Sequence, residues 1–148
     1  MNLKKLFRPK SLAIIGGYWA DFVYDGNKTI GYKGKVWHIN PSRKSSKTKK
    51  YYKNIKDLPE VPDCVYLAVS SDLTIKLIKD ISEIGVGGTV CLASRFSELN
   101  SKEGSNKTNQ LINNAGKNVC YSSSSSLVAI TRYYFSLNMY IFRSPHFL

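Results

Sequence analysis

An apolar run that ends in two glycines is the feature that most constrains this chain. The segment Ser11–Ile15 leads directly into Gly16 and Gly17. Its last three residues, Ala13, Ile14 and Ile15, show no polar alternation, which is typical of an inner parallel strand covered on both faces. The glycines then allow a sharp turn and the close approach of a ligand to the backbone. A short helix after such a turn can receive a phosphate group at its N-terminus.

The rest of the chain alternates between strand-like and helical patterns. Further strands are predicted over Lys35–Asn40, Cys64–Val69 and Gly88–Ala93, with another beginning at Val119. Helices are predicted over about Ala20–Lys28, Asp72–Ile84 and Ser105–Ala115. This order predicts an α/β fold: a Rossmann-like parallel sheet of about five strands flanked by helices, with an irregular C-terminal tail. Ligands of such sheets bind at the carboxyl ends of the strands.

The helix predicted over Asp72–Ile84 carries the clearest amphipathic pattern. Its expected apolar face contains Leu73, Leu77, Ile81 and Ile84. Ser71 or Asp72 is the expected N-cap, and Gly85 the expected stop. The last helix is expected to bury Leu111 and Ile112.

Charge and cysteine content narrow the function classes. The 148-residue chain carries a net charge of +12, which favours an anionic partner: nucleic acid, a membrane surface or a phosphorylated cofactor. Much of this charge lies in Arg43–Lys53, which has six basic residues and no acid and is predicted to be an exposed loop. The three cysteines show no zinc-binding spacing, and Cys64 and Cys91 fit apolar strand positions. An odd cysteine count without a signal-like segment favours a cytoplasmic location, and we expect no membrane contact.

Several ordered segments resemble the CoA-binding domain of NDP-forming acyl-CoA synthetases, relatives of the succinyl-CoA synthetase alpha subunit. The matching segments are Leu6–Gly16, Gly31–Val36, Ile39–Pro41, Tyr52, Asp57–Asp63, Leu67–Val69 and Gly85–Val86. They fall within residues 6–117 and are specific as an ordered set. The resemblance implies a Rossmann-like domain that holds coenzyme A by its phosphates and adenine.

The resemblance also implies a set of CoA-binding residues in the loops that follow the strands. These are Gly16, Gly17, Tyr18, Trp19 and Ala20 after the first strand, Asn40, Pro41, Ser42 and Lys44 after the second, Ser70 and Ser71 after the third, and Ser94, Arg95 and Phe96 after the fourth. The family's first loop is usually longer and richer in glycine. Here the bulky Tyr18 and Trp19 follow Gly17 and are expected to narrow the pocket, whether they stack on adenine or pack against the helix.

The C-terminal part departs from the family pattern. We expect a CoA-binding Rossmann-like domain over residues 1–117 and a low-complexity or aberrant tail over 118–148, such as a truncated or shifted reading frame would produce. Five serines, Ser122–Ser126, and a Tyr/Phe-rich segment stand where the family continues into a Gly-Pro-Asn-Cys motif. The phosphorylated histidine and the ATP-grasp domain of the family are also missing, so no catalytic residue and no metal site are predicted.

The predicted function is therefore that of the N-terminal, CoA-binding part of an NDP-forming acid–CoA ligase. The expected partners are CoA or acyl-CoA and ligase or ATP-grasp domains on another chain. A nucleotide-binding regulatory module of the same fold is the alternative. Two points disfavour NAD: the glycine turn lacks a full GxGxxG, and Asn40, not an acidic residue, ends the second strand. Nucleic-acid binding ranks last because charge alone supports it. His38, inside the second strand, is expected to be structural.

Overall fold

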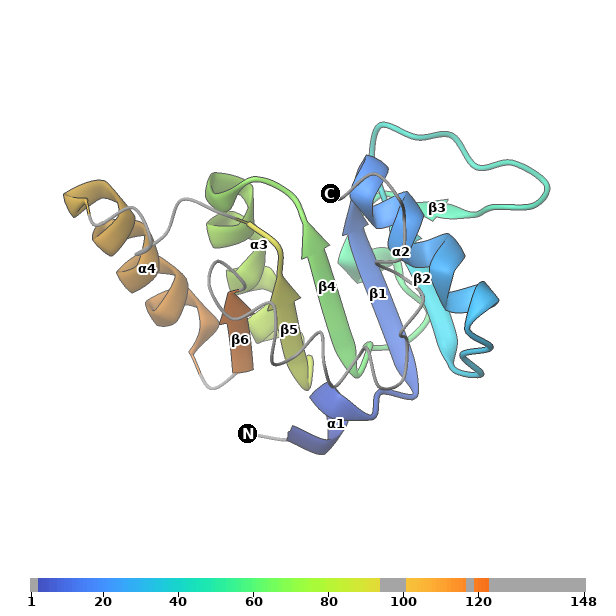
Figure 1. The fold of residues 1–148 in the computed structure, drawn as a ribbon, viewed down its shortest axis with the longest axis horizontal. Coiled ribbons are helices and arrows are strands. Elements are labelled where there is room, and N and C mark those ends of the chain that lie inside the picture. The colour runs from blue at the N-terminus through green and yellow to red at the C-terminus, as the bar shows by residue number, and fades with distance from the viewer. Residues whose placement is uncertain (1–2, 94–100, 117–118, 123–148) are drawn as a thin grey trace, which may run out of the picture.

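The structure, a computed structural model, describes residues 3–93, 101–116 and 119–122. The helices are α1 (Leu3–Phe7), α2 (Tyr18–Thr29), the 3-10 turn η1 (Ile55–Asp57), α3 (Ser71–Glu83) and α4 (Lys102–Ala115). The strands are β1 (Ser11–Gly16), β2 (Lys35–Ile39), β3 (Tyr51–Tyr52), β4 (Cys64–Ala68), β5 (Gly88–Cys91) and β6 (Val119–Ser122). They form one parallel sheet in the order β3-β2-β1-β4-β5-β6 (Figure 1). The predicted Rossmann-like α/β class is confirmed.

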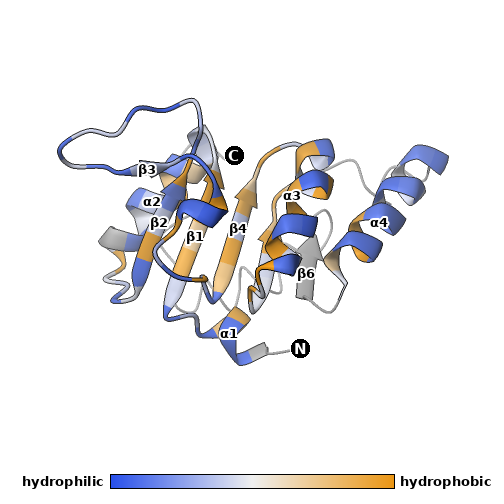
Figure 2. Ribbon diagram, turned by 180° about the vertical axis from the view of Figure 1, so that it is seen from behind, coloured by the Kyte–Doolittle hydropathy of each residue, from blue (hydrophilic) through white to orange (hydrophobic). Residues whose placement is uncertain are grey.

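Alternate residues of β1 serve two separate cores. Leu12 and Ile14 pack toward α1 and α2 with Ala20 and the buried Leu6 of α1. Ala13 and Ile15 face the opposite side, where they join a larger cluster that includes apolar residues of η1, α3 and α4. Figures 1 and 2 show α2 on one face of the sheet and α3 and α4 on the other. Both faces of β1 are covered, as the unbroken apolar run predicts.

The strand that begins at Val119 takes its place beside β5, as predicted. The sheet thus reaches Ser122, beyond residue 117, while residues 123–148 lie outside the described part of the chain. A domain boundary at 117 and an aberrant tail remain predictions. Cys64 and Cys91 are buried, which agrees with their predicted role as small apolar residues.

The N-terminal ends of the helices differ from the sequence predictions. Helix α3 has Ser70 as its N-cap, with the Ser70 hydroxyl accepting a hydrogen bond from the Leu73 amide, so the predicted cap at Ser71 or Asp72 is wrong. Helix α2 already begins at Tyr18, within the expected turn. Helix α4 begins at Lys102, where the Ser101 hydroxyl accepts from the Gly104 amide at 3.0 Å. Each helix starts earlier than predicted. The residue just before each start is a serine or a glycine, and both residue types are favourable N-caps.

The predicted apolar faces of α3 and α4 are partly wrong. The buried face of α3 contains Thr74, Ile75, Ile78 and Ile81, whereas Leu73 is 43% exposed. On α4, Leu111 is buried but Ile112 is 62% exposed. Apolar residues surround more than half of α3, so periodicity alone allows two overlapping stripes. Because α3 connects β4 to β5, its position in this crossover determines which of the two stripes packs against the sheet.

Gly16 combines a positive φ with close packing against the next strand. Its φ is +146°, and a Cβ there would lie 2.4 Å from the carbonyl oxygen of Ala68 on the adjacent β4. We expect Gly16→Ala to lower the free energy of unfolding by about 2 to 5 kcal/mol through backbone strain and overpacking. Urea unfolding monitored by circular dichroism measures this change.

Gly17 provides the matched control. A Cβ there would meet no atom within 4 Å. Gly17→Ala should therefore cost less than about 1 kcal/mol, mainly through a weaker helix start. Equal losses of stability in the two variants would contradict the role assigned to the Gly16–Ala68 contact.

Candidate functional site

The carboxyl ends of β1, β2 and β4 meet at one edge of the sheet. Gly16 is the register partner of Ala68, and Ile15 is the partner of Ile39. The loops after these three strands therefore start side by side, together with the first turn of α2 (Figure 1). In parallel sheets of this kind, this edge is where ligands bind.

The start of α2 presents backbone amides at this edge. The Asp21 amide donates to the Gly17 carbonyl at 3.0 Å, which closes the first turn, while the amides before it have no partner within the helix. Ala20 is fully buried against the sheet, but Tyr18 and Trp19 are 74% and 47% exposed. Their rings contact each other edge to face, with centroids 5.5 Å apart. The amides and the two rings could both face a ligand.

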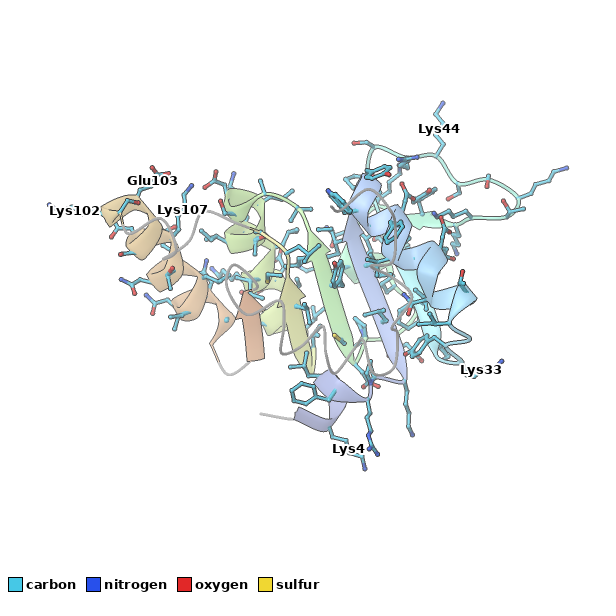
Figure 3. All side chains as sticks on the ribbon, viewed as in Figure 1. Lys4, Lys33, Lys44, Lys102, Glu103 and Lys107 are labelled. Atoms are coloured by element: carbon cyan, nitrogen blue, oxygen red, sulfur yellow. The ribbon has the colours of Figure 1, made fainter. Side chains whose placement is uncertain are left out.

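Asn40 ties the loop after β2 to the end of β1. Its side-chain amide donates to the Gly16 carbonyl at 2.8 Å, and its Oδ1 accepts from the Ser42 amide at 3.0 Å. The residue is only 8% exposed. Asn40 therefore holds the two loops together, whereas Pro41, Ser42 and Lys44 are exposed. The Lys44 side chain extends away from the body of the protein (Figure 3).

Most of the basic segment Arg43–Lys53 is exposed, as its composition predicts, but the segment is anchored at both ends. Tyr51 and Tyr52 form β3 and are half-buried beside β2. Lys53 donates to the carbonyl oxygens of Pro41 and Arg43 at 2.6 and 2.8 Å. The loop between β2 and β3 is thus tied back at its base, while its middle extends from the molecule (Figure 1).

Asp21 gathers three donors from this segment. One carboxylate oxygen lies 2.8 Å from Lys49 Nζ and accepts from the Tyr51 hydroxyl at 3.0 Å, while the other lies 2.8 Å from Arg43 Nη2. Burial alone would raise the pKa of Asp21, but the hydrogen bonds from Lys49 and Tyr51 and the positive charge of Lys49 outweigh burial and lower it. Asp21 is therefore ionised at neutral pH and joins α2 to the basic segment.

His38 lies beneath this cluster and is fully buried. Its Nε2 is 3.3 Å from the Gly16 carbonyl, and its Nδ1 is 3.6 Å from Asp21 Oδ1. Burial lowers the pKa of the imidazole despite the nearby carboxylate, so the ring is neutral at pH 7. Tyr24 and Tyr51 pack against it. These contacts fit the predicted structural role of His38.

The two serines after β4 are engaged in starting α3. The Ser70 hydroxyl caps the helix, and its carbonyl accepts from the Thr74 amide at 2.8 Å. Ser71 is 5% exposed, so only Ser70 of this pair reaches the surface. The remaining predicted residues, Ser94, Arg95 and Phe96, lie outside the described residues.

The structure therefore brings Gly16, Gly17 and Asn40 together and places Ser70 at the same sheet edge. Sequence reasoning missed the cluster of Asp21, Arg43, Lys49 and Tyr51. The available signal was the i, i+4 pair Asp21 and Asp25 on α2 together with an acid-free basic segment, which favours an ionic contact without identifying the partners. Among the described residues, no group of three or more potential ligands is placed to hold a metal ion. None of the described helices is long and apolar enough to cross a membrane.

A family model, described as a CoA binding domain, matches residues 10–124. This match includes the whole sheet edge described above, and the chain belongs to this family. It resembles the N-terminal part of NDP-forming acid–CoA ligases, as the following relatives show.

One relative is the acetate–CoA ligase [ADP-forming] II of Archaeoglobus fulgidus, 30% identical over 106 residues, which are 68% of this chain and 16% of the relative. The alpha subunit of acetate–CoA ligase [ADP-forming] I from Pyrococcus furiosus is 27% identical over 126 residues, 79% of this chain and 27% of that subunit. A solved structure of a dinucleotide-forming acetyl-coenzyme A synthetase from Ca. Korarchaeum cryptofilum superposes with a TM-score of 0.69 at 27% identity, over 77% of this chain and 25% of that one. The chain thus spans about a sixth of the first relative's length.

The lowered pKa of Asp21 predicts a pH-dependent contribution to stability. A carboxyl group whose folded-state pKa lies below its unfolded value near 4 stabilises the fold above that pH. This contribution is lost as the pH falls through the folded-state pKa. We expect Asp21→Asn to lower the free energy of unfolding by about 1 to 3 kcal/mol at pH 7. The difference from wild type should shrink below about pH 4, as measured by urea unfolding at a series of pH values.

Asp25→Asn is the control, because Asp25 is 63% exposed and contacts only Lys49 within this cluster, at 3.3 Å. Its effect should stay within about 0.5 kcal/mol. A loss in Asp21→Asn that persists unchanged at pH 3 would show that the carboxylate charge is not the stabilising element.

Proposed function

We propose that this chain binds coenzyme A, free or acylated, at the edge formed by the carboxyl ends of β1, β2 and β4. The observation that carries the proposal is the family match over residues 10–124. A second support is the chemistry of the edge itself. The amides at the start of α2 and the positive end of its dipole suit a phosphate group.

Several of the predicted site residues can be given a role in this proposal. Gly17 leaves space above the first turn of α2, since no atom lies within 4 Å of its missing Cβ. The exposed rings of Tyr18 and Trp19 lie edge to face, so one ring or the other offers its face for stacking on adenine. Ser42 and Ser70 present exposed polar groups from the neighbouring loops. The contacts proposed for Ser94, Arg95 and Phe96 rest on the family resemblance.

The relatives are named as acid–CoA ligases, and this chain spans only part of their length. We propose that it supplies the CoA site for an NDP-forming acid–CoA ligase reaction. The phosphoryl-transfer steps would then be performed by ligase and ATP-grasp domains on another chain. Under this proposal the domain binds CoA without converting it.

Isothermal titration calorimetry with CoA, NAD and a short DNA duplex tests the proposal directly. We expect CoA to bind with a dissociation constant at least about tenfold lower than that of NAD, a difference of about 1.4 kcal/mol. The end of β2 supports this order, because Asn40 offers no carboxylate for the ribose of NAD. Binding of NAD without CoA would support the alternative nucleotide-binding module instead.

Substitution of Gly17 tests whether a phosphate group of CoA binds beside the start of α2. Gly17→Asp and Gly17→Asn add side chains of the same shape, and both residues are good helix N-caps. Only the aspartate adds a negative charge beside the proposed phosphate position. We expect CoA to bind Gly17→Asp roughly tenfold more weakly than Gly17→Asn, from the repulsion of two nearby charges.

Circular dichroism of both Gly17 variants should show the wild-type fold. Equal CoA affinities of the two would place the phosphates away from the start of α2.

A further inference from the structure

We propose that Asp21 is a positioning residue that orients the Arg43 guanidinium, and that Arg43, not Lys44, is the cation of the basic segment that contacts a phosphate group of CoA. This inference rests on the proposed CoA-binding function. It adds Asp21 and Arg43 to the site, and the sequence analysis assigned neither residue to CoA binding.

The first step of the argument is where the Arg43 guanidinium lies. Its Nη2 is 2.8 Å from Asp21 Oδ2. The backbone amide of Asp21 in turn donates to the Gly17 carbonyl at 3.0 Å. The guanidinium is therefore held within one helical turn of Gly17, where the proposed phosphate meets the start of α2.

The second step is that the Arg43 backbone is fixed as well. The Arg43 amide donates to the Asn40 carbonyl at 3.3 Å, and Lys53 Nζ donates to the Arg43 carbonyl at 2.8 Å. Asn40 is itself bonded to the Gly16 carbonyl. Both ends of the Arg43 residue are thus tied to the sheet edge, which reduces the entropy lost when the side chain contacts a ligand.

The third step is that Arg43 keeps hydrogen-bonding capacity for a ligand. A guanidinium carries five N–H donors, and the contact with Asp21 Oδ2 engages one nitrogen. The side chain of Arg43 is 49% exposed, so its remaining donors can reach a bound anion. The Asp21 carboxylate also has Lys49 and the Tyr51 hydroxyl as partners. The negative charge of Asp21 therefore keeps these two partners when the Arg43 guanidinium also binds a phosphate.

The fourth step is the contrast with the neighbouring lysines. Lys44 extends into solvent away from α2 (Figure 3), and Lys47 is also exposed. A flexible exposed lysine loses more side-chain entropy on binding than an arginine that is already oriented. These lysines contribute to the general positive potential, whereas Arg43 has a defined position beside the helix start.

The test compares single-charge variants by calorimetric titration with CoA. Arg43→Gln, Lys44→Gln and Lys47→Gln each remove one positive charge. We expect Arg43→Gln to weaken CoA binding at least about tenfold, and the two lysine variants less than about threefold. A loss in Lys44→Gln equal to or larger than that in Arg43→Gln would overturn the proposal.

Asp21→Asn and Asp25→Asn separate positioning from charge, because each removes one carboxylate from α2. If long-range charge alone mattered, both would strengthen the binding of an anion. We expect Asp21→Asn to weaken CoA binding about threefold to tenfold, while Asp25→Asn leaves it unchanged or slightly stronger. Stronger binding by both variants would overturn the positioning role.

A ligand-free measurement supplies a second readout. Trypsin cleavage after Arg43 requires the base of the loop to open, because Asp21 pairs with the Arg43 side chain and Lys53 bonds to its carbonyl. We expect cleavage there to be several-fold faster in Asp21→Asn than in Asp25→Asn or wild type, and equal rates would contradict the anchoring of the loop. If wild-type protein does not bind CoA, the proposed function and this inference both fail. If wild type binds CoA but Arg43→Gln behaves like Lys47→Gln, only the inference fails.

Discussion

The close packing of Gly16 against its neighbours is the constraint on which the site depends. A Cβ at Gly16 would lie 2.4 Å from the Ala68 carbonyl oxygen, and the Gly16 carbonyl accepts from the Asn40 side chain at 2.8 Å. These two contacts join the carboxyl ends of β1, β4 and β2. The start of α2 follows immediately, so the backbone amides of its first turn lie at the same edge. Loss of the contact with Asn40 or Ala68 would separate the three loops that form the proposed site.

Asp21 extends this arrangement from the sheet edge to the basic segment. The sequence predicts an exposed loop for these six cations and identifies no ionic partner for them. In the structure, Arg43 and Lys49 instead converge on a carboxylate of α2, and Tyr51 joins them from β3. Partial burial of Lys49 and Asp21, both 18% exposed, reduces screening by solvent and makes this contact stronger than an ordinary surface ion pair.

The sequence predicts the sheet better than it predicts the site. The unbroken apolar runs of β1 and β4 and the helix stop at Gly85 are local signals, and the strand and helix order follows from them. The face of α3 was not predictable because its isoleucines and leucines form two overlapping stripes, and only the packing of the sheet chooses between them. The strand β3 has only two residues, Tyr51 and Tyr52, and its pairing with β2 is a tertiary contact without a periodic pattern.

The site residues likewise divide into those with a local sequence signal and those that depend on tertiary contacts. Gly16 and Asn40 were identified because a glycine at a strand end and an Asn-Pro turn are visible in the sequence. The resemblance also favoured Lys44 in the loop after β2, although its neighbour Arg43 is the residue that meets α2. Which of two adjacent basic residues turns toward the helix depends on Asp21, which lies 22 positions earlier in the chain. A contact over that separation requires the fold to be known.

Different charges at this edge are expected to determine the affinity for an anion and the rate at which the anion associates. Arg43 and Lys49 face Asp21 and Asp25, so the cluster beside the start of α2 has two cations opposite two carboxylates and little net charge. The positive potential therefore comes mainly from the exposed Lys44, Lys47 and Lys50. Exposed charges of this kind steer an anion toward a site and lose their effect in salt, whereas oriented, partly buried groups determine how long it stays bound. The anchored cluster is thus suited to holding a phosphate group, whereas the exposed lysines around it are suited only to attracting one.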